Sequence, residues 1–250
     1  MRGTSDFAAA AAPGTVDGVP LTIEARFNGP DDSANGGYAC GLFAGVCPEP
    51  VAVTLHAPPR LEVPLRAEAG ARRAHLWDGD DLVATAAPTR HRVVPPAPVP
   101  LAAARAAVAH YRGRRGHPYP HCFACGPGRA PGDGLRLAPG PVPDRAGTVA
   151  CPWVPDAGLL AADGRVRAEF VWAALDCPSG WTADLVAAPK VLGWMRAELT
   201  RRPLAGERCV VVATLGSLDS AGLAASSALY DEAGSLLAAA TTRWYAPSAG

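Results

Sequence analysis

A chain of 250 residues that is 49% apolar and 18% charged can bury a sizeable core, as one large domain or as two ordinary ones. Its 23 basic and 23 acidic residues give a formal net charge of zero, which argues against binding to nucleic acid or to an anionic membrane. Seven irregularly spaced cysteines favour a reducing, cytoplasmic setting over a disulfide framework, and no apolar run is long enough to span a bilayer.

The beginning of the chain predicts a tail, a strand and a helix of small residues. Residues 1–18 lack a basic start and a secretory core, so we expect a frayed tail. The abundance of Ala, Gly, Pro and Arg in the whole chain is typical of a bacterial sequence of high GC content. Leu21–Asn28 alternates apolar and polar residues, as a half-buried strand does. Ser33 is a candidate N-cap for a helix over Asn35–Cys47.

This first helix has glycines, Gly36 and Gly37, in its first turn. Glycine lowers helix propensity, but it leaves bare backbone N–H groups that suit an anion or an oxyanion. The alternative is that the glycines only allow close packing of the helix on a sheet.

Short strands and a linker complete the first part. The predicted strands are Val51–Ala57, Leu61–Ala67, Ala71–Trp77 and Leu82–Ala87, with a hairpin turn over Asp78–Asp81. Val93–Pro100 is a Pro-rich linker, and Leu101–Tyr111 has the apolar spacing of a short helix, which we expect to pack on the outside.

The segment His117–Gly126 contains a Cys-x-x-Cys pair, Cys122 and Cys125, and two histidines, His117 and His121. Thiolates and imidazoles are zinc ligands, but the sequence offers no second pair at suitable spacing, and the prolines resist folding round one ion. We therefore predict a buried turn before a strand, with both cysteines reduced and free of metal.

The last part predicts strands on both sides of one apolar helix, Ala168–Val186. The predicted strands are Gly134–Ala138, Gly147–Val154, Val191–Thr200, Arg208–Leu215, Leu223–Tyr230 and Ser235–Tyr245. From Phe170 to Cys177 the helix is apolar on every side except at Asp176, which is typical of a buried helix. Pro178 should kink or end it.

Asp176 is the lone acid of the apolar stretch Phe170–Cys177. An ionised carboxylate is costly there unless it is paired, and burial raises its pKa. Asp176 is therefore either a structural group that caps a turn or meets an arginine, or a catalytic carboxylate.

The two parts of the chain echo each other. Leu76–Asp78 and Leu82–Ala86 near the end of the first correspond to Leu229–Asp231 and Leu236–Ala240 near the end of the second. Each half reads strand, buried helix, then antiparallel strands, an order that resembles the hotdog fold, in which a curved antiparallel sheet wraps one long helix. The resemblance implies an α+β double hotdog with halves 19–93 and 121–250, joined by a linker with a short helix over 94–120.

The second half is similar to hotdog acyl-CoA thioesterases of the phenylacetate-pathway type. Relatives of that type often open with Cys-Phe-x-Cys-Gly-Pro and a later Gly-Leu, which here are Cys122–Pro127 and Gly134–Leu135. In that family a His-Gly-Gly begins the helix and an Asp or Glu follows nine positions after the His. The oxyanion-hole glycine and the carboxylate come from facing subunits.

This sequence divides those parts between its halves. Asn35–Gly37 stands where His-Gly-Gly would be, but nine positions after Asn35 is Ala44. Asp176 stands where the carboxylate would be, but nine positions before it is Arg167. The resemblance thus implies one composite site, in which the Gly36 and Gly37 N–H groups polarise a thioester carbonyl and Asp176 attacks it or activates a water.

Three side chains are lesser candidates for orienting water or substrate: Asn35, Glu169 and Ser179. Cys177 is a possible nucleophile, but no histidine that could act as its base follows His121 in the chain.

The resemblance implies a thioesterase-like hydrolase that acts on a small-molecule acyl-CoA or an acyl-carrier thioester. Coenzyme A would enter as part of the substrate, with no other cofactor, no metal, and neither nucleic acid nor membrane as partner; a homodimer of double hotdogs is compatible with this. The alternative is a non-catalytic acyl-thioester-binding or scaffold protein of the same fold.

Overall fold

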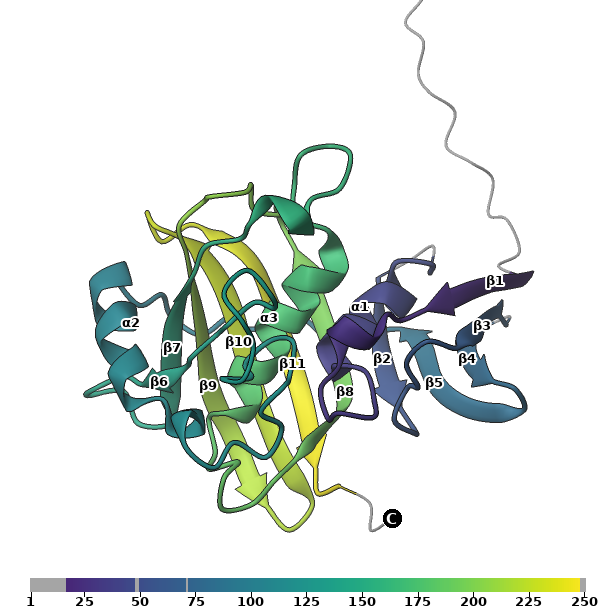
Figure 1. Cartoon of the computed structure of the whole chain (residues 1–250), viewed down its shortest axis with the longest axis horizontal. Helices are drawn as coiled ribbons and strands as arrows, with labels where there is room; N and C mark the ends of the chain where they lie inside the picture. The colour runs from purple at the N-terminus through teal and green to yellow at the C-terminus, as the bar shows by residue number, and fades with distance from the viewer. Residues whose placement is uncertain (1–16, 48–49, 71, 248–250) are drawn as a thin grey trace, which may run out of the picture.

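One antiparallel sheet runs through the computed structural model, which describes residues 17–47, 50–70 and 72–247 (Figure 1). Within these residues the sheet has eleven strands in the order β1-β3-β4-β5-β2-β8-β11-β10-β9-β7-β6. The strands are β1 (Asp17–Thr22), β2 (Val51–Leu55), β3 (Pro64–Ala69), β4 (Ala74–Asp78), β5 (Asp81–Pro88), β6 (Gly140–Pro141), β7 (Thr148–Trp153), β8 (Val191–Leu199), β9 (Cys209–Asp219), β10 (Gly222–Asp231) and β11 (Leu236–Tyr245).

Few helices accompany this sheet. The α-helices of the described part are α1 (Gly36–Ala44), α2 (Leu101–Ala107) and α3 (Ala168–Gly180). The 3-10 helices are η1 (Ala25–Phe27), η2 (Val108–His110), η3 (Arg112–Arg114) and η4 (Ala157–Leu159). No helix of the described residues is long and apolar enough to cross a membrane.

The strand order is the same in both halves of the chain, read from opposite edges of the sheet. The first half runs β1-β3-β4-β5-β2 and the second runs β7-β9-β10-β11-β8, with β6 added at the outer edge. The halves meet where β2 pairs with β8, with Val53 opposite Met195. This pairing makes one continuous sheet out of two similar ones.

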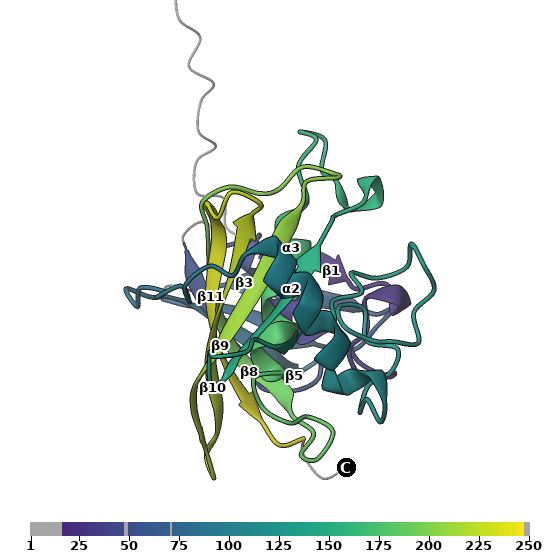
Figure 2. The ribbon, with the colours of Figure 1, turned by 90° about the vertical axis from the view of Figure 1, so that its left-hand side faces the viewer.

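The helix α3 packs on β8, β9, β10 and β11, and α1 packs on β2, β8 and α3 (Figure 1). Every residue of α3 from Phe170 to Gly180 is buried, which confirms the prediction of a helix enclosed on all sides. The short helix α2 lies on β7 and β9, over a second apolar cluster that includes Val210 and Val212 (Figure 2). It therefore packs on the outside of the sheet, as predicted.

The glycines of α1 allow the close approach of the two inner helices. A Cβ atom on Gly41 would lie 2.7 Å from Glu169 Cα, and one on Gly37 would lie 2.9 Å from the carbonyl oxygen of Trp172. A Cβ atom on Gly36 would lie 2.8 Å from Leu192 Cβ on β8. The packing interpretation of these glycines is thus confirmed, although the contact is with a helix as well as with the sheet.

Several predicted boundaries are wrong near the beginning of the chain. β1 ends at Thr22, because the predicted strand turns into η1 and buries Phe27, whose ring stacks on Tyr38 at 4.4 Å between centroids. Asn35, rather than Ser33, is the N-cap of α1, since its Oδ1 accepts a hydrogen bond from the Tyr38 N–H at 2.9 Å. The predicted tail lies outside the described residues except for its last two, which belong to β1.

Two boundaries are also wrong in the second half. Gly134–Ala138 is not a strand. The helix α3 continues through Pro178 and ends at Gly180, where the sequence suggested a break at the proline or a helix to Val186. Hydroxyl groups stabilise the last turn, because Ser227 Oγ donates to the Leu175 carbonyl at 2.7 Å and Ser179 Oγ donates to the Asp176 carbonyl at 2.6 Å.

Candidate functional site

A pocket of about 400 Å³ opens between the two halves of the chain. The N-terminus of α1 and the second half of α3 form its inner wall, together with the loop that carries Cys122 and Cys125 and the ends of β8 and β11. Its lining includes Asn35, Gly36, His117, Cys122, Cys125, Asp176, Cys177, Trp181, Leu192 and Trp244.

The buried carboxyl group of Asp176 connects α3 to α1. Its Oδ2 accepts a hydrogen bond from the Gly37 N–H at 2.8 Å, although the two residues are 139 positions apart in the chain. Its Oδ1 is buried and has no partner among the described residues. Burial raises the pKa of Asp176 well above its usual range, the Gly37 N–H opposes that rise, and the nearby Cys122 adds to it.

Three successive N–H groups at the start of α1 have different roles. The Tyr38 N–H is bonded to Asn35 Oδ1, and the Gly37 N–H is bonded to Asp176. The Gly36 N–H has no hydrogen bond to any described residue, and Gly36 lines the pocket. The prediction that both glycine amides face a substrate carbonyl therefore needs correction, because the carboxyl group of Asp176 already occupies the Gly37 amide.

Asn35 both caps α1 and faces two sulfur atoms. Its Nδ2 lies 3.5 Å from Cys177 Sγ and 3.7 Å from Cys122 Sγ. The side chain is 2% exposed and lies at the pocket wall, so it belongs to the cluster of predicted residues that the fold brings together.

Glu169 and Ser179 lie apart from this cluster, and neither is among the described residues that line the pocket. Glu169 is in the first turn of α3, where Arg167 Nε lies 3.1 Å from its Oε1, about 10 Å along the helix axis from Asp176. Ser179 is fully buried, and its Oγ accepts hydrogen bonds from Thr242 Oγ1 at 2.7 Å and Trp244 Nε1 at 2.9 Å. Both have structural partners instead of the substrate contacts expected of them.

The cysteine segment lies against α3 as a tightly held turn. Its backbone is anchored because the Phe123 N–H donates to the Asn28 carbonyl at 2.8 Å and the Tyr111 hydroxyl donates to the Cys125 carbonyl at 2.9 Å. The predicted buried turn is confirmed, but no strand follows it directly.

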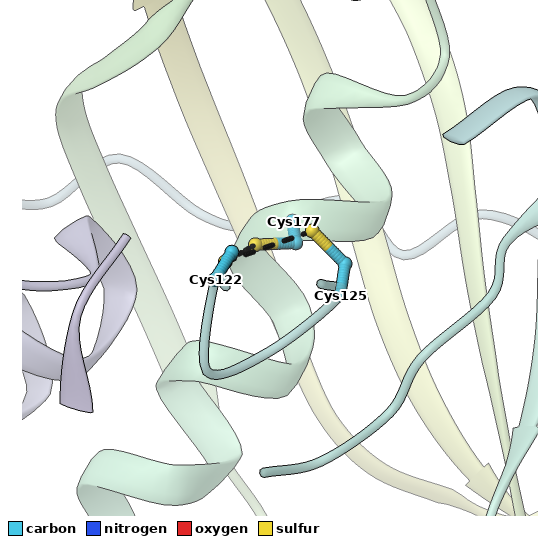
Figure 3. Close-up of side chains that lie close together, drawn as sticks. All are labelled: Cys122, Cys125 and Cys177. Atoms are coloured by element: carbon cyan, nitrogen blue, oxygen red, sulfur yellow. Dashed lines mark hydrogen bonds between the residues drawn. The ribbon is translucent and has the colours of Figure 1, made fainter. Parts of the chain in front are cut away.

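Cys177 of α3 joins Cys122 and Cys125 in one sulfur cluster, and the three side chains point toward one another (Figure 3). Cys122 Sγ lies 3.7 Å from Cys177 Sγ and 3.7 Å from Cys125 Sγ. Hydrogen bonds from the Cys125 and Cys177 thiols hold the pKa of Cys122 well below its usual range. Sequence reasoning missed this cluster, since Cys177 is 52 positions beyond Cys125 and follows no ligand spacing.

Two nitrogen groups also touch the sulfur cluster. His117 Nε2 and Trp181 Nε1 each lie 3.4 Å from Cys125 Sγ. Burial lowers the pKa of His117 and so favours its neutral form, whereas the nearby Cys122 opposes that shift.

By the repeat of the two halves, a second site would lie between the N-terminus of α3 and the C-terminal end of α1, but among the described residues there the glycine amides on α3 and the acid on α1 are missing. The N-cap of α3 is Arg167, whose side chain makes no capping bond, and no glycine stands in the first turn of α3. Ala44, at the end of α1, offers no acid. Within the described residues, a carboxyl group on one inner helix that faces glycine amides on the other therefore occurs once, at Asp176 and Gly36–Gly37.

The sequence matches no protein-family model, and no curated protein matches it. The structure is similar to that of the TesB protein of Mycobacterium avium subsp. paratuberculosis, with a TM-score of 0.59, 14% identity, and 94% of this chain and 95% of that chain covered. It is also similar to a hotdog-fold protein of unknown function from Alicyclobacillus acidocaldarius, with a TM-score of 0.56, 14% identity and 97% of each chain covered.

The fold is of the hotdog type. The predicted hotdog fold is thereby confirmed over nearly the whole chain. A shorter match, to a putative thioesterase related to phenylacetic acid degradation from Ralstonia eutropha JMP134, covers 54% of this chain and 98% of that one at 22% identity and a TM-score of 0.43.

Proposed function

We propose that this chain is a double hotdog that hydrolyses an acyl-CoA or an acyl-carrier thioester at one composite site. Support for the double arrangement comes from the identical strand order of the halves and from the central pairing of β2 with β8. In this proposal α1 and α3 are the central helices of the two halves.

The observation that carries the proposal is the position of Asp176. Its side chain extends from α3 of one half to the first turn of α1 in the other half, and Asp176 and Gly36 line the same pocket. A buried acid with one unpartnered oxygen is costly for the fold, and such groups gather at functional sites. No arginine or lysine is bonded to it among the described residues, so an ion pair does not explain its presence.

In the proposed reaction the thioester carbonyl lies at the start of α1. The free N–H of Gly36 and the positive end of the helix stabilise the oxyanion, where one such donor contributes about 100- to 1000-fold. Asp176, when ionised, takes a proton from a water that attacks the carbonyl carbon, and then passes the proton to the leaving thiolate. The alternative within the same site is direct attack by the carboxylate, followed by hydrolysis of the mixed anhydride.

The raised pKa of Asp176 suits the first of these roles. A carboxylate with a raised pKa is a stronger base than an ordinary one once it is ionised. Substrate that binds near Gly36 would also compete with Asp176 for amide donors, which would release the carboxylate at the moment of reaction.

A non-catalytic acyl-thioester binder is the second candidate. The observation that favours it is the closed Gly37–Asp176 hydrogen bond, which gives the carboxyl group a structural partner. A binder would retain acyl-CoA without turnover, whereas the hydrolase releases free thiol.

The test compares two carboxyl-to-amide variants on the same helix over a panel of acyl-CoAs, with release of free thiol as the readout. Asp176→Asn keeps shape and hydrogen bonding, and we expect it to lower kcat at least about 1000-fold. Glu169→Gln makes the same chemical change outside the pocket, and we expect turnover within a few-fold of the parent.

Hydrolysis by Asp176→Asn at the parent rate would refute the mechanism. Binding of an acyl-CoA by the parent chain with no thiol release across the panel would establish the binder instead.

A further inference from the structure

The sulfur cluster of Cys122, Cys125 and Cys177 has the composition and dimensions of a metal site. These are three buried cysteines whose Sγ atoms all lie within 4.8 Å of one another (Figure 3). Two come from one turn and the third from a helix 52 positions further along, so the fold positions the cluster precisely through tertiary contacts.

The distances fit tetrahedral zinc. With Zn–S bonds of about 2.3 Å, two thiolates of a tetrahedron lie about 3.8 Å apart. The two closest sulfur pairs, which share Cys122, are each separated by 3.7 Å. A zinc ion would therefore require only small shifts of these side chains.

Two N–H donors face the sulfur cluster. Asn35 Nδ2 faces the sulfurs of Cys122 and Cys177, and Trp181 Nε1 faces that of Cys125. Both groups are N–H donors that find no oxygen acceptor among the described residues, and N–H donors around metal-bound ligands orient and stabilise them. Of the three sulfurs, His117 forms a hydrogen bond only with that of Cys125, and its ring is not part of the compact cluster of ligand atoms.

A disulfide accounts for the cluster less well. It would join two of the three sulfurs at about 2.05 Å and leave the third with no partner of its kind.

We propose that Cys122, Cys125 and Cys177 bind one zinc ion, whose fourth position faces the pocket shared with Asp176. This reverses the expectation from sequence, which favoured a metal-free turn over zinc because only one ligand pair was visible. The structure supplies the third ligand from α3. Closed structural zinc sites have four protein ligands, whereas three protein ligands and an open position are typical of sites that bind an exogenous group. The inference stands independently of the proposed hydrolase activity.

The test measures zinc in the untagged full chain, purified under reducing conditions without chelator, and titrates the metal-free chain with Zn²⁺. We expect about one zinc per chain. Titration with Co²⁺ should give the absorption of a tetrahedral thiolate site, with thiolate-to-cobalt charge-transfer bands.

Two matched variants locate the site. Cys177→Ala should weaken zinc binding at least about 100-fold, since it removes a ligand, whereas Cys151→Ala removes a buried free cysteine outside the cluster and should leave binding unchanged. His117→Gln should retain the zinc. Loss of zinc from this variant would show that His117 is the fourth ligand, and would overturn the open fourth position.

Two results would overturn the site itself. One is a reduced parent chain with all thiols free that takes up no zinc and gives no cobalt charge-transfer band. The other is a native disulfide between any two of the three cysteines, detected by mass spectrometry after alkylation. Both are measured on the parent chain, so they do not depend on whether a variant folds.

Discussion

The Gly37 N–H donates a hydrogen bond to Asp176 Oδ2 across 2.8 Å, and this single contact joins the first turn of α1 to the second half of α3. The two residues are also closely packed, since a Cβ atom on Gly37 would overlap Asp176 Cβ. The geometry of the site and the packing of the helices therefore depend on the same few atoms.

Gly37→Ala should destabilise the chain because the added methyl group overlaps Asp176 and the Trp172 carbonyl. Overpacking of this kind costs about 1–3 kcal/mol, and we expect a loss in that range in urea unfolding. Gly45→Ala at the C-cap of the same helix is the control, because its Cβ atom would meet only backbone oxygens at 3.4 Å. Gly45 is also exposed and has helical backbone angles. Equal stability of both variants would contradict the close packing.

Asp176→Asn should raise stability at neutral pH and change it little in acid. The pKa of Asp176 is raised in the folded state, so the folded chain keeps its proton while the unfolded chain loses it as pH rises. The parent therefore loses up to about 1.4 kcal/mol for each pH unit between the unfolded and the folded pKa, and the asparagine variant does not.

The measurement for this prediction is the free energy of unfolding of both chains from about pH 4 to about pH 8. The difference between them should grow with pH from the unfolded pKa upward. A difference that is constant over this range would contradict the raised pKa.

Asn35 should have two separable effects. Asn35→Ala removes the cap of α1 and should cost about 0.5–2 kcal/mol in unfolding free energy, whereas Asn35→Ser keeps a side-chain oxygen for the Tyr38 N–H and should restore most of it. Both variants lose the Nδ2 donor, so both should weaken zinc binding about 10- to 100-fold. Restored zinc affinity in Asn35→Ser would show that the amide has no role at the sulfurs.

Ser179→Ala should affect stability and leave the substrate KM unchanged. The change leaves the buried Trp244 Nε1–H without an acceptor, and it leaves the Thr242 hydroxyl with only the longer bond to the Ala225 carbonyl. Losing such buried partners costs about 1–3 kcal/mol. Ser217→Ala on the exposed end of β9 is the control and should be neutral within about 0.5 kcal/mol. A raised KM with unchanged stability would restore Ser179 to the substrate site.

The sequence alone determined the elements whose signal is local. The apolar character of Phe170–Cys177 on every side marked α3 as an enclosed helix, and alternation with turn residues marked most of the strands close to their observed bounds. The two-half repeat was visible for the same reason, because each half repeats one order of elements. The position of Asp176 as the lone acid within the enclosed stretch Phe170–Cys177 needed no more than this pattern.

Tertiary structure alone decided which groups meet. Gly37 and Asp176 are 139 positions apart, and Asp176 occupies the Gly37 amide only because the glycines let α1 approach α3 closely. Cys177 joins Cys122 and Cys125 for the same reason, since no spacing in the chain predicts a contact that depends on where a turn packs against a helix. Local periodicity specifies each element, whereas contacts between elements depend on how their side chains pack, and that information is spread over both halves of the chain.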